Sequence, residues 1–160
     1  MPDKKEDSTL AATEFHRKTA IACFNKAWDL LDKKDRSPEE DLQMLHVAHA
    51  SRYHWGYIGK ANNFAIGDWQ ISRVYAALKH AAPALLFAKS SLDLCQKNDL
   101  KELLPSAYEG MARAHATAND TTEARRYVEL ARKELELIGD EEDRKIYRQQ
   151  IDETETLIRK

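Results

Sequence analysis

The segment from Pro105 to Ile138 constrains the fold of this chain most strongly, because it reads as two helices joined by a tight polar turn. Small residues stand where the two helices must touch: Ala112 in the first, and Ala124 and Ala131 in the second. Asn119-Asp120 makes the turn between them. A helical hairpin of this kind cannot bury its own apolar face and must stack on neighbours. The pattern therefore favours a binding scaffold over a self-contained catalytic pocket.

Composition supports one helical, globular domain. The 160 residues fit a single domain with its own core, and 42% hydrophobic with 32% charged residues is typical of a folded protein. Five glycines and four prolines leave room for long helices and argue against an all-β fold. The net charge is −2, with both signs interspersed, so no polybasic block supports nucleic-acid binding.

The termini and the cysteines indicate no export or membrane insertion. Residues 1–7 are charged and lack the apolar stretch of a signal peptide, and no apolar run approaches the roughly 18 residues of a membrane span. We expect residues 1–7 to be a disordered tail, residues 8–160 to form a single domain, and the protein to be cytoplasmic. Cys23 and Cys95 stand in unrelated segments and are predicted to be buried, reduced thiols.

Hydrophobic periodicity predicts seven helices, arranged as three antiparallel hairpins and a polar last helix that caps them. Ser37, Pro38 and Glu40 form the clearest start signal, a capping box with proline at the first helical position. Asn62-Asn63 offers N-caps for the third helix, and Gly67 is expected where another helix passes closely. The expected helices cover residues 8–34, 38–57, 63–79, 83–96, 104–118, 121–138 and 141–159.

Two of these helices have distinct apolar stripes. The first helix is predicted to bury Ile21, Phe24, Trp28 and Leu31. The last helix has a thinner stripe among many charges, at Tyr147, Ile151 and Ile158. A mostly polar helix with one thin apolar stripe is typical of an end cap, which keeps a helical stack in solution.

The segment 105–138 resembles a tetratricopeptide repeat (TPR). Tyr108 takes the first aromatic position of the repeat and Ala112 its small position, and two alanines of the second helix stand where the repeat has alanines. His115 and Val128 depart from the pattern, because aromatic residues are usual there.

The rest of the chain carries the resemblance more weakly. Residues 68–94 match part of the repeat, whereas residues 8–58 supply a helix pair without its signature. The stretch 49–55 resembles a segment of uncharacterised bacterial proteins of the same superfamily. The resemblance implies an all-α, TPR-like right-handed stack of antiparallel helical hairpins, about seven helices with a C-terminal capping helix.

In the TPR family the first helix of each repeat lines a concave groove that binds peptides. The resemblance places Trp69, Arg73, Glu109 and Arg113 at such groove positions. Trp69 and Arg73 are four residues apart, so the guanidinium group can stack over the indole. The Lys and Asn set with which the best-known groove of this family binds a C-terminal carboxylate is missing, so that activity is not supported.

Upstream of these positions, Arg52, His54 and Trp55 form a second group of candidate binding residues. Arginine and tryptophan are side chains that most often dominate binding hot spots. We interpret the two groups together as a groove for an acidic or aromatic peptide end. The alternative for Trp55 and Trp69 is a plain role in the core at a hairpin junction.

A histidine pair offers an alternative chemistry. His46 and His49 are three residues apart and share one helical face, so they can supply two metal ligands. His54 lies round the helix from His49, and a further ligand would have to come from elsewhere, such as Glu14 or Asp41. The competing interpretation is that His46 and His49 form hydrogen bonds between helices.

The sequence therefore predicts a non-catalytic scaffold that binds a protein or peptide, without a cofactor, nucleic acid or membrane. No nucleophile elbow, phosphate loop, dinucleotide fingerprint or zinc-protease motif occurs. Two alternatives stay open: a divalent-metal-dependent enzyme that uses His46 and His49, and a self-associating structural protein. The binding hypothesis predicts that Trp69→Ala or Arg73→Ala leaves the fold largely intact and abolishes capture of the partner.

Overall fold

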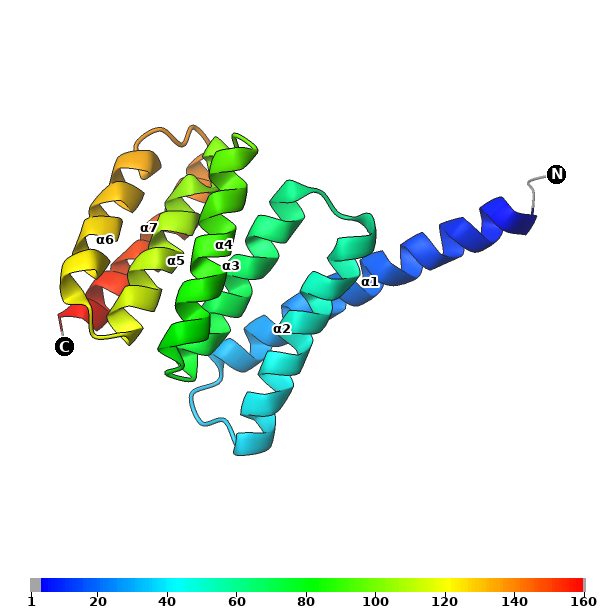
Figure 1. Cartoon of the computed structure of the whole chain (residues 1–160), viewed down its shortest axis with the longest axis horizontal. Coiled ribbons are helices and arrows are strands. Elements are labelled where there is room, and N and C mark those ends of the chain that lie inside the picture. Colours follow the sequence, from blue (N-terminus) through cyan, green and yellow to red (C-terminus); the bar gives the residue numbers. More distant parts are fainter. Residues whose placement is uncertain (1–3, 160) are drawn as a thin grey trace.

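A computed structural model describes residues 4–159 and shows an all-helical protein (Figure 1). Within these residues there are seven α-helices, one short 3-10 helix and no β-strand. The expected all-α fold class is confirmed, and each expected helix is present with its ends shifted by a few residues. The α-helices are α1 (Lys4–Asp32), α2 (Pro38–Ile58), α3 (Ala61–Ala77), α4 (Ala81–Lys97), α5 (Leu104–Thr117), α6 (Thr121–Leu135) and α7 (Glu141–Ile158), and the 3-10 helix η1 is Lys101–Leu103.

The N-terminal end differs from the prediction. Helix α1 begins at Lys4, so residues 4–7, expected in a disordered tail, are helical; residues 1–3 of that tail lie outside the described residues. The reason is local: no glycine or proline interrupts the chain between Lys4 and Asp32, so the helix propagates through the charged start. The first part of α1 projects beyond the rest of the bundle (Figure 1).

The helix starts follow the capping signals in one case and depart from them in another. The capping box before α2 is confirmed, because Glu40 N–H donates to Ser37 Oγ at 3.3 Å and Ser37 N–H donates to Glu40 Oε2 at 2.9 Å. The prediction of Asn62-Asn63 as N-caps is wrong. Lys60 is the N-cap of α3, and Asn63 sits inside the helix, where its side chain accepts the Lys60 N–H at 3.0 Å.

Three turns, after α3, α4 and α5, share one geometry. Lys79, Asp99 and Asn119 have φ of 61°, 54° and 60°, which is the left-handed region. In each turn the N–H of the following residue donates to a carbonyl five residues earlier, at 2.9 Å. This is the Schellman arrangement that satisfies the last carbonyls of a helix. The turns recur every 20 residues, so one hairpin occupies 40, the spacing that separates Ala84 from Ala124.

The helices pack as successive antiparallel hairpins, α1 with α2, α3 with α4 and α5 with α6 (Figure 1). Contacts of α2 with α3 and of α4 with α5 join one hairpin to the next. Helix α5 packs between α3 and α7, and α7 also contacts α6. The predicted contact positions are confirmed, since Ala112, Ala124 and Ala131 are fully buried.

Buried serines mark a similarly close approach in the hairpin of α3 and α4. Ser72 Oγ donates to the carbonyl of Ala84, and Ser91 Oγ donates to the carbonyl of Ala65, both at 2.8 Å. A buried hydroxyl needs a partner, and here the backbone of the facing helix provides it. The small side chains therefore set both the spacing of the two helices and their register.

Candidate binding groove

A buried carboxylate on α5, Glu109, brings together four of the seven predicted groove residues. Glu109 is 1% exposed. Trp69 of α3 donates its indole N–H to Glu109 Oε2 at 3.0 Å, and Arg113 donates from Nε to Oε1 at 2.8 Å. Arg73 of α3 holds its Nη1 3.7 Å from Oε1, an ion pair without a hydrogen bond.

Helix α7 completes this set. Thr154 donates its hydroxyl to Glu109 Oε1 at 2.5 Å, and Arg73 Nη2 donates to Glu153 Oε2 at 2.9 Å. Glu153 Oε2 also lies 3.9 Å from Arg113 Nη2. We call these six residues (Trp69, Arg73, Glu109, Arg113, Glu153 and Thr154) the Glu109 cluster. The last helix of the chain therefore covers the groove positions that the two arginines occupy.

Opposing effects act on the Glu109 carboxyl. Burial alone raises its pKa, but the guanidinium groups of Arg113 and Arg73, with hydrogen bonds from Thr154 and Arg113, outweigh burial and hold the pKa below its ordinary value. The pKa of Arg73 is itself lowered, by burial and by the neighbouring charge of Arg113, with Glu109 and Glu153 acting against this. Glu109 is thus ionised and internally paired.

The charged side chains of the Glu109 cluster therefore form ion pairs with one another. The side chains of Arg73 and Arg113 are each 12% exposed and face Glu109 and Glu153. Two cations meet two anions, which leaves no charge over for an acidic ligand. The expectation that Arg73→Ala leaves the fold largely intact does not follow from this arrangement, because the substitution removes a partner of a buried carboxylate.

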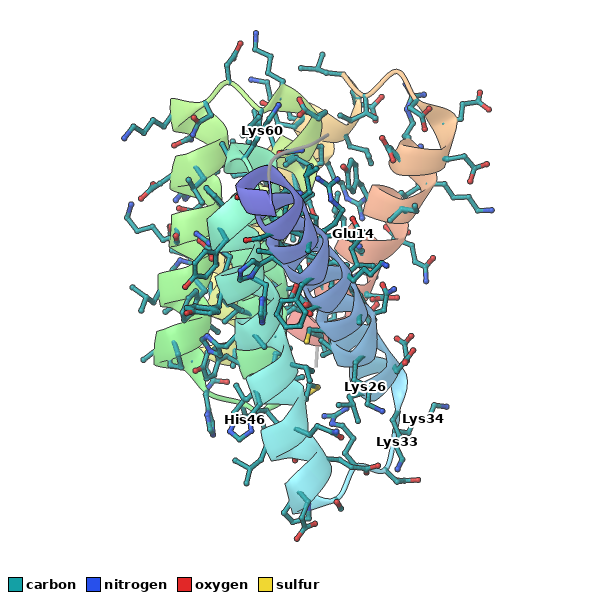
Figure 2. All side chains as sticks on the ribbon, turned by 90° about the vertical axis from the view of Figure 1, so that its right-hand side faces the viewer. Glu14, Lys26, Lys33, Lys34, His46 and Lys60 are labelled. Atoms are coloured by element: carbon teal, nitrogen blue, oxygen red, sulfur yellow. The ribbon has the colours of Figure 1, made fainter. Side chains whose placement is uncertain are left out.

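Beside the Glu109 cluster lies an open apolar pocket of about 330 Å³, which we call the main pocket. It opens between α1 and α7, which stand at the front and at the right of Figure 2. Helices α3, α4 and α5 and the 3-10 helix η1 supply the rest of its lining. Its principal lining side chains are Phe24, Trp28, Ile66, Trp69, Ile146 and Tyr147.

A smaller pocket of about 170 Å³, the side pocket, adjoins the main pocket and shares Phe24 and Ile66 with it. Trp55 of α2 lines it together with Ile21 and Gly67. The close passage predicted at Gly67 is confirmed, since a Cβ there would lie 2.8 Å from Cδ of Arg52 on α2. We call the main and side pockets together the apolar groove.

All three tryptophans of the chain line the apolar groove. The predicted stacking of Arg73 on Trp69 is confirmed, with Arg73 Cζ 5.6 Å from the ring centre, and Arg73 also lies 5.2 Å from the ring centre of Trp28. The rings of Trp28 and Trp69 are 5.7 Å apart. The apolar stripe of the first helix predicts that Trp28 faces the rest of the protein. Nothing in the sequence predicts that it packs against Trp69 and Arg73 of α3.

Few polar groups face the main pocket. Gln150 of α7 lines it, and its buried Oε1 has no hydrogen-bond partner within residues 4–159. Burial, followed by the nearby Asp143 and Glu102 carboxylates and the Cys95 thiol, raises the pKa of Tyr147 to about 12. Burial and Glu102 raise the pKa of the Cys95 thiol to about 12 as well, so it is protonated. The hydroxyl of Tyr147 and the thiol of Cys95 are therefore both protonated at neutral pH.

Two predicted groove residues lie apart from the main pocket. Arg52 donates from Nε to Asp68 Oδ1 at 2.8 Å, and its guanidinium group lies over the ring of Phe64. His54 faces His16 of α1, with their Nδ1 atoms 2.8 Å apart. Arg52 is therefore committed to joining α2 to α3, and His54 to joining α2 to α1.

Of the two histidines, His49 makes the kind of contact between helices that the non-metal interpretation expects. His49 Nε2 lies 3.1 Å from the hydroxyl of Tyr75 on α3, and burial lowers the pKa of His49. His46 is exposed on the outer side of α2 (Figure 2). In the part of the chain that the structure describes, no three His, Cys, Asp or Glu side chains converge as a metal site would require.

Comparison with protein-family models, with curated proteins and with solved structures finds no match to this chain. Across residues 4–159, none of the helices combines the length and the apolar composition needed to cross a membrane.

Proposed function

We propose that the chain is a non-catalytic, TPR-like scaffold, a right-handed stack of helical hairpins, which binds a peptide segment of a partner protein in the apolar groove. The placement of all three tryptophans along this groove carries the proposal. Tryptophan supplies much of the binding energy at protein interfaces. The recurring 20-residue turn and the fully buried alanines of α5 and α6 support a TPR-like stack.

The shape and the rim of the groove suit side chains of a partner. A volume of about 330 Å³ is at the lower end of ligand-binding cavities, and its lining is aromatic and aliphatic. Two rim residues remain half exposed, Ile146 at 50% and Ile21 at 46%. Covering the rest of each side chain would stabilise a complex by about 1 kcal/mol.

A binding experiment with a neutral polar substitution on the rim tests the groove. Peptides are first selected from a random displayed library against the wild-type protein. Ile146→Asn should weaken the selected peptides about tenfold, because it replaces an apolar contact beside the main pocket with a polar amide. Leu137→Asn is the matched control, since Leu137 is 74% exposed and lies outside the groove. Titration is followed by tryptophan emission, because all three tryptophans line the groove. Peptides that bind Ile146→Asn as tightly as wild type, with unchanged emission, would rule the groove out.

Self-association is a second candidate, favoured by a specific surface. Three aromatic side chains there are largely exposed: Phe15 of α1 (60%), and Tyr53 (62%) and Tyr57 (60%) of α2. They lie together, because Tyr57 stacks on His16 and Phe15 contacts His54. Sedimentation at rising concentration tests it: association that Phe15→Ser with Tyr57→Ser abolishes would support it, and a wild-type monomer would rule it out. The metal-hydrolase alternative gains no support from the contacts of His46 and His49.

A further inference from the structure

The charges around the main pocket indicate what kind of segment would occupy it. The Glu109 cluster beneath the pocket is neutral, since Arg73 and Arg113 are balanced by Glu109 and Glu153. The charge that an entering segment meets is therefore set by the rim, and the rim is acidic on the side of α7.

Two carboxylates adjoin residues of this rim and have no ion-pair partner among the described residues. Asp143 lies one turn before Tyr147 on α7, and Glu102 directly precedes Leu103 in η1; Tyr147 and Leu103 both line the pocket. Neither carboxylate forms an ion pair with any of the described residues, and the nearby Lys101 is paired with Asp99 at 3.4 Å. They place negative charge beside an apolar opening, and the N-terminus of α7 offsets only part of it.

Two of the three basic side chains of α7 lie away from this face, and the third, Arg144, donates from Nε to the carbonyl of Ile138 at 2.9 Å. Asp143 lies one turn before Tyr147, on the side of α7 that also carries Ile146 and Gln150. Lys145 and Arg148 fall on the opposite side of the helix.

One polar side chain among the lining residues has an unpaired atom. Gln150 lines the pocket, and its Oε1 is buried without a hydrogen-bond partner among the described residues. A buried acceptor of this kind is satisfied when a ligand brings an N–H group.

We propose that the apolar groove binds a basic peptide segment, one that inserts a large apolar side chain into the main pocket and places a lysine or arginine next to it, beside Asp143 and Glu102. The apolar side chain meets Phe24, Trp28 and Ile146, and a backbone or side-chain N–H of the segment meets Gln150. This inference rests on the proposed function, because it names the chemistry of the partner for that same groove.

Two short peptides that differ only in charge test it, acetyl-Lys-Phe-Lys-amide and acetyl-Glu-Phe-Glu-amide. Binding is followed by nuclear magnetic resonance at the three indole N–H signals, which resolve the main pocket from the side pocket. At low salt the lysine peptide should bind about three- to tenfold more tightly, and the preference should shrink in 0.5 M salt.

Neutral substitutions locate the source of the preference. Glu102→Gln with Asp143→Asn should bring the two peptides to equal affinity. The control is Glu136→Gln with Glu141→Gln, in which Glu141 lies in the same first turn of α7 but on the far side from the pocket. The control should keep the preference. Asp143→Asn leaves the helix cap in place, because Asp140 binds the backbone N–H of residue 143.

The outcomes separate this inference from the proposed function. Equal affinities, a preference for the glutamate peptide, or a preference that survives Glu102→Gln with Asp143→Asn would overturn the basic-segment proposal and leave the groove as a binding site. If neither peptide shifts any indole signal, the groove is not a peptide site of this kind and both proposals fail.

Discussion

Replacement of Glu109 by glutamine should destabilise the protein far more than its conservative size suggests. The side chain is 1% exposed and accepts hydrogen bonds from Trp69, Arg113 and Thr154. Glu109→Gln keeps the shape but removes the charge that two buried guanidinium groups face. Removing one partner of a buried ion pair lowers the free energy of unfolding by about 3–5 kcal/mol. For a chain of this length, that corresponds to a loss of about 6–20 °C in Tm.

The matched control is Glu153→Gln, which touches the same Arg73 from the surface. Glu153 is 46% exposed, so solvent screens its ion pair and the expected loss is below about 1 kcal/mol. Both variants and the wild type are compared by thermal and urea unfolding, followed by circular dichroism. A loss under 1 kcal/mol for Glu109→Gln, or equal losses for the two variants, would refute the assignment of Glu109 as the centre of the cluster.

The pH dependence of the free energy of unfolding tests the role of the Glu109 carboxyl independently. The pKa of Glu109 is lower in the folded protein than its ordinary value of 4.5. A group with a depressed folded pKa contributes stability above its unfolded pKa and loses it as the pH falls through the folded pKa. The difference in the free energy of unfolding between wild type and Glu109→Gln should therefore be full at pH 6–7 and shrink as the pH falls below about 4.5. A difference that stays constant into acid would show that the charge of Glu109 is not what stabilises the fold.

Three further predictions follow from local geometry. Lys79→Gly should raise the free energy of unfolding by up to about 1 kcal/mol, because φ is 61° there and glycine adopts this left-handed region without strain. Asn119→Gly should raise it less, because asparagine already tolerates this region. Urea unfolding of both variants measures the two changes. Gly110→Ala should lower the free energy of unfolding by about 1–3 kcal/mol and shift the tryptophan emission, since the new Cβ would lie 2.9 Å from Cδ1 of Trp69. Gly139→Ala is the control: a Cβ there has nothing within 4 Å, so it should change neither the stability nor the emission. Cys95 should resist iodoacetamide at pH 8 in the folded protein, and the less buried Cys23 should react first, because burial raises the pKa of the Cys95 thiol to about 12. Mass spectrometry follows the labelling of both thiols. Faster labelling of Cys95 than of Cys23 would contradict the burial of Cys95.

The helices could be predicted from the sequence because their signals are local. The capping box of Ser37 and Glu40, the alanines of α5 and α6, and the stacking of Arg73 on Trp69 all depend on residues within one or two turns. The start of α1 could not be predicted, because a charged segment without an apolar stripe does not distinguish a helix from a tail.

The organisation of the site could not be predicted, because its contacts join residues far apart in the chain. Glu109 meets Trp69 across 40 residues and Thr154 across 45. A glutamate at a groove position next to Gly110 is expected to be solvent-exposed from the sequence; the packing of α3 and α7 on α5 buries it. Gly110 is a local indication that another side chain passes closely, since the absence of a Cβ leaves room for the indole of Trp69.

The packing of each hairpin mainly against its neighbours has a consequence for how the protein opens. Helices α1 and α2 meet the rest of the bundle mainly through α3, and α1 projects past it. In such a linear array the end units can unfold while the middle stays folded, so protection against amide hydrogen exchange is lowest at the ends. Because Phe24, Trp28 and Trp55 come from α1 and α2, fraying of that first hairpin would dismantle one wall of the groove while α3 to α7 remain folded.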